Sequence, residues 1–183
     1  MPSSRRLPTT LLTALLVLLP LPGRTLTVDA NPEAATGSTQ KTLAHASRWM
    51  AASANPLATE AGRQVLRDGG SAVDAAIAMQ MVLALVEPQS SGLGGGAFIV
   101  AYDSRRRTLT SFDGRETAPA AAGPSLFVAD GKPLAFGDAV NSGLAVGTPG
   151  VLRALELAHR RHGKLRWARL LAPAIALAEQ GFP

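Results

Sequence analysis

The chain has 183 residues, of which 46% are hydrophobic, and this length allows one domain with a core of its own. Aromatic residues make up only 4%, so the core must consist mainly of alanine, leucine and valine. Three arginines and one aspartate lie in the first thirty residues, and the remainder carries 15 basic and 12 acidic residues. That balance is too mild to predict nucleic acid as a partner. The absence of cysteine excludes disulfides, a thiol nucleophile and cysteine metal sites.

Residues 1–30 have the layout of a secretory signal peptide. Arg5 and Arg6 supply a positively charged start, residues 7–19 are mostly apolar, and small residues suited to cleavage occur at 28–30. The apolar stretch is too short to span a bilayer comfortably as a helix. The sequence therefore predicts an exported protein, periplasmic or secreted. Twin-arginine export and a retained membrane anchor stay open as alternatives.

The mature chain is expected to begin with a flexible polar segment at 31–47. Residues 49–52 are apolar and predict a short buried strand. Asn55 followed by Pro56 predicts the start of a first helix, because asparagine is a good cap and proline fits the first helical position. The paired glycines at 69–70 predict its end.

Ser71 and Asp74 form a capping-box pattern that predicts a second helix over 72–85. This helix is apolar nearly all round, which is typical of a helix packed between other layers. Residues 97–102 and 109–112 then predict two strands of an antiparallel hairpin. The three consecutive arginines between them are interpreted as solvated residues of the hairpin loop rather than as a binding patch.

The carboxyl-terminal half predicts two more helices after an irregular segment. Residues 118–141 are rich in alanine, glycine and proline and predict that irregular segment. Thr148 is expected to cap a third helix over 149–162. A fourth helix is expected over 165–180, with a kink or a division at Pro173.

The segment 92–97 matches G-x-G-x-x-A, the pattern of a dinucleotide-binding turn. That turn must follow a strand and open a helix, whereas here a helix is expected before the glycines and a strand after them. Dinucleotide binding is therefore not favoured. Two alternatives stay open. The glycines permit positive φ and close backbone packing at a helix-to-strand turn, or they place backbone amides near a ligand.

Arg115 lies between Asp113 and Glu116 at the far end of the second predicted strand. Its planar guanidinium matches a carboxylate bidentately, so it suits the binding of a small carboxylate. From these residues alone, an ordinary ion-pair cluster at a sheet edge is the favoured interpretation. The functional interpretation requires Arg115 to be partly buried, with the flanking carboxylates holding its orientation. An acid/base pair of Asp113 and Glu116 is a further alternative.

The remaining histidine and serine candidates match no metal-binding or nucleophile pattern. His45, His159 and His162 fit no zinc pattern. Ser90 and Ser91 lack the surroundings of a nucleophile elbow and are expected to bond local backbone. We therefore expect no metal, no cofactor and no catalytic nucleophile in these 183 residues.

Five short blocks resemble the γ-glutamyltranspeptidases and occur in that family's order. They are N-P-L-A-T-x-A-G (55–62), G-G-S-A-V-D-A-A-I-A (69–78), E-P-Q-S-S-G-L-G-G-G (87–96), D-G-R-E-T-A-P (113–119) and G-T-P-G (147–150). The resemblance covers about residues 48–183. It implies an α+β fold, the αββα sandwich of an N-terminal nucleophile hydrolase. Only the amino-terminal portion of that sandwich is expected here, as an incomplete large subunit.

The resemblance also implies a mechanism. Such precursors cut themselves before a threonine, which becomes the nucleophile of a small subunit with its own α-amino group as base. Backbone amides of the small subunit stabilise the oxyanion. The γ-glutamyl group of glutathione or a related amide passes to water or to an amino acid. Arg115 is the one substrate-binding residue that carries over, with the α-carboxylate of the glutamyl group as its implied partner.

The chain is expected to end well inside the large subunit. The self-cleavage site, the catalytic threonine and the oxyanion donors would then lie beyond Pro183, and the fragment alone would be inactive. Two alternatives stay open: a truncated remnant or binding module without turnover, and the front of a related acylase that acts on cephalosporin side chains.

Overall fold

The computed structural model describes residues 42–182. The predicted signal peptide at 1–30 and most of the predicted flexible segment at 31–47 lie outside the described residues. Residues 42–47 are exposed and form neither helix nor strand. Within the described part of the chain, no helix combines the length and the hydropathy needed to cross a membrane.

Helices α1 (Pro56–Arg67) and α2 (Ala72–Val86) are adjacent and begin at the caps predicted from the sequence. The side chain of Asn55 accepts a hydrogen bond from a backbone amide in the first turn of α1. Ser71 and Asp74 exchange the two hydrogen bonds of a capping box at the start of α2. Local side chains therefore determine where both helices begin.

Strands β1 (Ala97–Asp103) and β2 (Thr108–Gly114) form the predicted antiparallel hairpin. Because side chains alternate along a strand, the hairpin has two different faces. On the inner face, Ile99 and Phe112 pair with each other and join the core. The outer face carries large apolar side chains that are exposed: Phe98, Val100, Tyr102 and Leu109.

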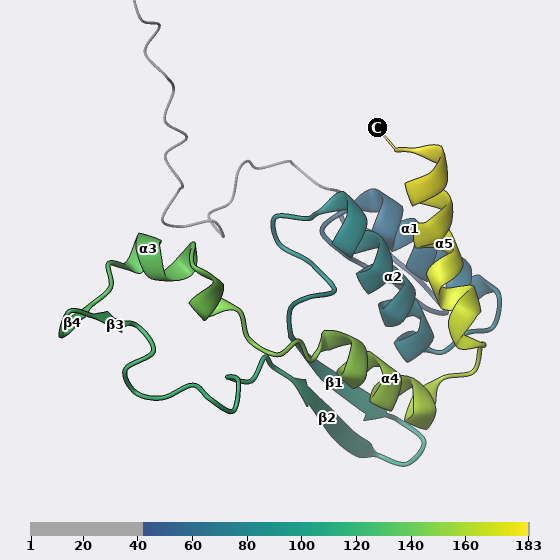
Figure 1. Ribbon diagram of the computed structural model, residues 1–183. Coiled ribbons are helices and arrows are strands. Elements are labelled where there is room, and N and C mark those ends of the chain that lie inside the picture. The colour runs from purple at the N-terminus through teal and green to yellow at the C-terminus, as the bar shows by residue number, and fades with distance from the viewer. Residues whose placement is uncertain (1–41, 183) are drawn as a thin grey trace, which may run out of the picture.

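Helix α4 (Val151–His162) lies against the hairpin, and α5 (Trp167–Gln180) lies beside α2 (Figure 1). Helix α2 contacts α1, α4 and α5, which explains why its sequence is apolar nearly all round. The core between these helices and the hairpin consists mostly of alanine, valine and leucine, as the composition predicts. Helix α5 runs through Pro173 as one helix, so the proline does not divide it.

Between the hairpin and α4 the chain makes a long excursion away from the helices (Figure 1). It contains the two-residue strands β3 (Val128–Ala129) and β4 (Lys132–Pro133), the short helix α3 (Phe136–Val140) and the 3-10 turn η1 (Gly143–Ala145). None of these four elements contains a buried residue. The segment predicted to be irregular at 118–141 is thus an excursion, as expected, but it contains the short helix α3 and a small hairpin that the sequence did not predict.

The buried strand predicted at 49–52 is wrong. These residues belong to no strand, and Trp49 and Met50 are 37% and 57% exposed. The segment lies against α1 instead, where a Cβ placed on Gly62 would be 3.3 Å from the Cβ of Ala51. Ala51 therefore lies close to a helix rather than in a sheet.

The predicted cap of α4 is also wrong. The residue at the cap position is Gly150, and no side chain caps the helix. The carbonyl of Gly95 accepts hydrogen bonds from the amides of Gly150 and Val151, both at 3.2 Å. Thr148 instead pairs with Thr117 in an isolated antiparallel bridge. A contact between distant segments therefore satisfies the first amides of α4.

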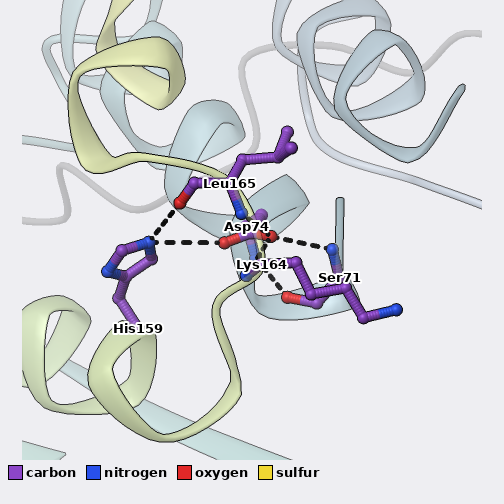
Figure 2. A network of polar contacts seen from close by, with 5 residues as sticks. All are labelled: Ser71, Asp74, His159, Lys164 and Leu165. Atoms are coloured by element: carbon purple, nitrogen blue, oxygen red, sulfur yellow. Dashed lines mark hydrogen bonds and ion pairs between the residues drawn. The ribbon is translucent and has the colours of Figure 1, made fainter. Parts of the chain in front are cut away.

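Asp74 is fully buried and ties α2 to the connection between α4 and α5 (Figure 2). Its Oδ2 accepts hydrogen bonds from the backbone amides of Ser71, Lys164 and Leu165 at 2.8, 2.9 and 3.2 Å. Nε2 of His159 lies 2.8 Å from the carbonyl of Leu165 and 3.6 Å from Oδ1 of Asp74. Because both neighbours are acceptors, we assign the ring proton to Nε2.

Candidate functional site

Three segments that are distant in the sequence meet around Arg115. They are the glycines at 94–96 before β1, the turn at 113–117 after β2, and residues 147–150 before α4. The antiparallel hairpin places the first segment beside the second. The second and third are joined by a bridge with N–H···O distances of 3.3 and 2.8 Å. Three of the five sequence blocks therefore form one neighbourhood.

The two carboxylates that flank Arg115 contact different parts of it, one the side chain and the other the backbone. Oε2 of Glu116 lies 3.5 Å from Nε of the arginine. Oδ1 of Asp113 accepts a hydrogen bond from the backbone amide of Arg115 at 2.9 Å and so shapes the turn. No hydrogen bond between the two carboxyl groups occurs in the described part of the chain, so the acid/base alternative gains no support.

The exposure of Arg115 differs from the prediction. Its side chain is 72% exposed, whereas the functional interpretation required partial burial. Within residues 42–182, only Glu116 of the two carboxylates holds the guanidinium. The arginine is thus oriented on one side and open to solvent elsewhere.

Glu116 rests on a glycine floor, which we define as Gly95, Gly96 and Gly147. A Cβ placed on Gly96 would lie 2.5 Å from Oε2 of Glu116 and 2.7 Å from the carbonyl oxygen of Gly114. At Gly147 it would lie 2.9 Å from the Cβ of Glu116. At Gly95 the nearest atom, Oε1 of Glu116, would be at 3.4 Å, which is ordinary contact. Two floor positions therefore exclude side chains.

The glycine segment at 92–97 does not have the context of a dinucleotide turn. It lies between the end of α2 and the start of β1, so no helix follows it. None of its glycines has positive φ, so that part of the prediction is wrong. Close packing, the other part, is supported at Gly96.

A cavity of about 530 Å³ lies beside the arginine. Arg115 and Glu116 form its charged part. The excursion supplies its apolar wall: Leu126, Phe127, Leu144 and Val146. A guanidinium at the edge of a partly apolar cavity can bind a carboxylate whose remainder lies along the wall.

A larger cavity of about 720 Å³ lies between α2, α4 and α5, away from Arg115. Its lining is mostly apolar, and its two arginines, Arg153 and Arg160, both pair with Glu156. Each of these two arginines uses a terminal nitrogen for its pair with Glu156, whereas the closest contact of Arg115 with Glu116 is through Nε. We therefore place the candidate site at the smaller cavity.

The other polar candidates have structural surroundings. His162 packs edge-on against Phe112, with ring centroids 6.0 Å apart. The hydroxyl of Ser91 accepts a hydrogen bond from the side chain of Gln80 at 2.7 Å, so the expected bond to local backbone is wrong for it. Among the described residues, no group of three histidine, aspartate or glutamate side chains is arranged to hold a metal ion.

Sequence reasoning missed the pairing of Thr117 with Thr148 and the docking of α4 on Gly95. It also missed the glycine floor under Glu116. The only signal was the close spacing of glycines in the blocks at 87–96 and 147–150, which does not reveal what packs against them.

The family model described as Gamma-glutamyltranspeptidase matches residues 58–183. Over 135 residues the chain is 47% identical to the glutathione hydrolase proenzyme of Bacillus subtilis strain 168. That alignment covers 73% of this chain and 23% of the relative. The chain therefore spans less than a quarter of the length of this relative.

Solved structures resemble the chain as well. The gamma-glutamyltranspeptidase of Helicobacter pylori is 33% identical with a TM-score of 0.72, over 77% of this chain and 40% of that one. The cephalosporin acylase of Bacillus halodurans is 32% identical with a TM-score of 0.70, over 85% of this chain and 28% of that one. These likenesses confirm the predicted α+β class and the amino-terminal portion of an N-terminal nucleophile hydrolase fold.

Proposed function

The chain belongs to the gamma-glutamyltranspeptidase family, and on that premise we propose that it is the amino-terminal part of a glutathione hydrolase precursor. The whole protein would cleave glutathione and other γ-glutamyl amides and transfer the γ-glutamyl group to water or to an amino acid. A threonine outside these 183 residues would be the nucleophile of a small subunit released by self-cleavage. The word proenzyme in the name of the Bacillus subtilis relative supports such processing.

The observation that carries the proposal is the guanidinium of Arg115 at the edge of the 530 Å³ cavity. Its closest ion-pair contact among the described residues is that of Nε with Oε2 of Glu116, at 3.5 Å. The terminal nitrogens remain for a planar anion, and we propose that this anion is the α-carboxylate of the γ-glutamyl group. The binding energy would position the scissile amide for the threonine.

We also propose that the protein is exported, with residues 1–30 as its signal peptide. Amino-terminal sequencing of the mature protein from the periplasm or the medium is expected to begin near residue 31. An intact amino terminus on cytoplasmic protein would contradict export.

The Arg115 proposal is tested in the full-length protein with two amides that differ in one group. γ-Glutamyl p-nitroanilide has the α-carboxylate, and 4-aminobutyryl p-nitroanilide lacks it. Arg115→Ala is expected to lower kcat/KM for γ-glutamyl p-nitroanilide. The expected loss of transition-state stabilisation is about 2–5 kcal/mol. For the second, kcat/KM is expected to change little. Arg115→Lys should raise KM for the γ-glutamyl donor strongly, because lysine lacks the bidentate fork.

Arg105→Ala in the exposed hairpin loop is the matched control and should leave both amides unaffected. An equal loss on both amides in Arg115→Ala would exclude carboxylate recognition by this residue. Activity of the unaltered protein on neither amide would exclude the proposed donor.

A second candidate function is acylase activity on a cephalosporin amide. The likeness to the Bacillus halodurans cephalosporin acylase, with a TM-score of 0.70, favours it. Assaying the full-length protein with a cephalosporin amide beside the γ-glutamyl anilide separates the two functions, since the preferred donor has the higher kcat/KM.

A further inference from the structure

We infer that Glu116 is a positioning residue, which turns the guanidinium of Arg115 so that its terminal nitrogens meet the substrate carboxylate. This inference rests on the proposed function and adds the group that directs the arginine. The structure singles out Glu116 over Asp113, because only the Glu116 carboxylate contacts the guanidinium.

Glu116 contacts the guanidinium at Nε rather than at its terminal nitrogens. A guanidinium presents two pairs of donors to carboxylates, one made of Nε with a terminal nitrogen and one made of both terminal nitrogens. Oε2 of Glu116 lies 3.5 Å from Nε of Arg115. Among residues 42–182 this is the only ion pair of the Arg115 side chain. Because Nε is the nitrogen nearest to Glu116, the pair of terminal nitrogens is the pair better placed to receive a second carboxylate.

The glycine floor restricts where the Glu116 carboxylate can lie. Gly96 and Gly147 have no room for a side chain, because Glu116 occupies that space. The Glu116 side chain is 36% exposed, against 72% for Arg115. Glu116 thus presents a supported carboxylate to an exposed arginine, which is the arrangement needed to reduce the rotamer freedom of the arginine before substrate binds.

The test measures kcat and KM of the full-length protein on the same two anilides. Glu116→Gln retains the shape and removes the charge. We expect it to raise KM for γ-glutamyl p-nitroanilide about twofold to fivefold, as for a partly exposed ion pair, with kcat little changed. The amide without the carboxylate should show no change. In an Arg115→Ala background, Glu116→Gln should have no further effect, because it acts only through the arginine.

The floor is tested with a matched pair of alanine substitutions. Gly92→Ala, outside the floor and the cavity lining, adds a methyl group with no atom within 4 Å and should leave the kinetics unchanged. Gly96→Ala displaces the Glu116 carboxylate and should raise KM for the γ-glutamyl amide at least as much as Glu116→Gln. Thermal unfolding of both variants shows whether the added contact with the Gly114 carbonyl destabilises the fold.

The outcomes separate the two proposals. If Arg115→Ala discriminates between the amides and Glu116→Gln does not, the positioning role is overturned and the proposed function stands. If Glu116→Gln changes both amides equally, or has the same effect without Arg115, its role is structural and the inference is also overturned. If Arg115→Ala itself fails to discriminate, the proposed carboxylate site is wrong.

Discussion

Asp74 shows how one side chain can hold two distant parts of this chain. Its Oδ2 accepts a hydrogen bond from the backbone amide of Ser71 at the start of α2. The same oxygen accepts hydrogen bonds from the backbone amides of Lys164 and Leu165, about ninety residues further along the chain. A buried carboxylate is costly unless it is hydrogen-bonded, and three backbone donors provide that compensation. The capping-box half of this role is visible in the sequence, whereas the long-range half is not.

Asp74→Ala is expected to lower the free energy of unfolding by about 3 kcal/mol, because three buried backbone amides lose a charged acceptor. Asp74→Asn should cost about 1 kcal/mol, since its amide oxygen can replace Oδ2 while its amide nitrogen faces the protonated Nε2 of His159. Urea unfolding of the full-length protein measures both. Asp68→Asn, at the exposed pair with Arg169, is the control with a cost of about 0.5 kcal/mol or less. If Asp74→Ala and Asp68→Asn lower the free energy of unfolding equally, Asp74 does not hold the two segments together as proposed.

At the scale of elements, the start of α1 is joined to the end of α2. The side-chain amide of Asn55 donates to Oε1 of Glu87 at 2.9 Å, and that of Gln89 donates to Oε2 at 2.5 Å. The bond from Asn55, and next that from Gln89, lowers the pKa of Glu87 below the ordinary value of a glutamate. A lowered folded-state pKa gives stability above the unfolded-state pKa that is lost as pH falls through the folded-state value.

Glu87→Gln should therefore lower Tm at neutral pH, and the difference from the unaltered protein should shrink as pH falls below the usual glutamate range. Thermal unfolding of the full-length protein across that range tests this. Glu179→Gln, on the exposed surface of α5, is the control and should leave Tm little changed. If the Tm difference between Glu87→Gln and the unaltered protein grows toward acid pH, the prediction is contradicted.

Elements set by local chemistry were predictable from the sequence, and elements set by distant contacts were not. The starts of α1 and α2 follow from Asn55 and from the Ser71 capping box. The cap at Thr148 failed because the Gly95 carbonyl holds the first amides of α4. The same limit applies to the site. The motif singles out Arg115 as the candidate residue, but the floor beneath Glu116 depends on three converging segments.

At the scale of the whole molecule, the outer face of the hairpin lacks a covering layer among the described residues. Phe98, Val100, Tyr102 and Leu109 are 63–69% exposed, while the inner face packs against α4. Burying each such side chain would stabilise the protein by roughly 1.5–3 kcal/mol. In a sandwich of two sheets, the second sheet would cover this face.

Residues 31–183 expressed alone are therefore expected to aggregate or to be degraded, because the outer face stays exposed. Val100→Lys with Tyr102→Lys should make that fragment more soluble, and the same pair should destabilise the full-length protein, where a second sheet would cover this face. Light scattering of the fragment and thermal unfolding of the full-length protein measure the two effects. Ser104→Lys with Thr108→Lys adds equal charge at exposed positions and controls for charge alone. A monodisperse fragment that unfolds cooperatively would show that the outer face needs no second sheet.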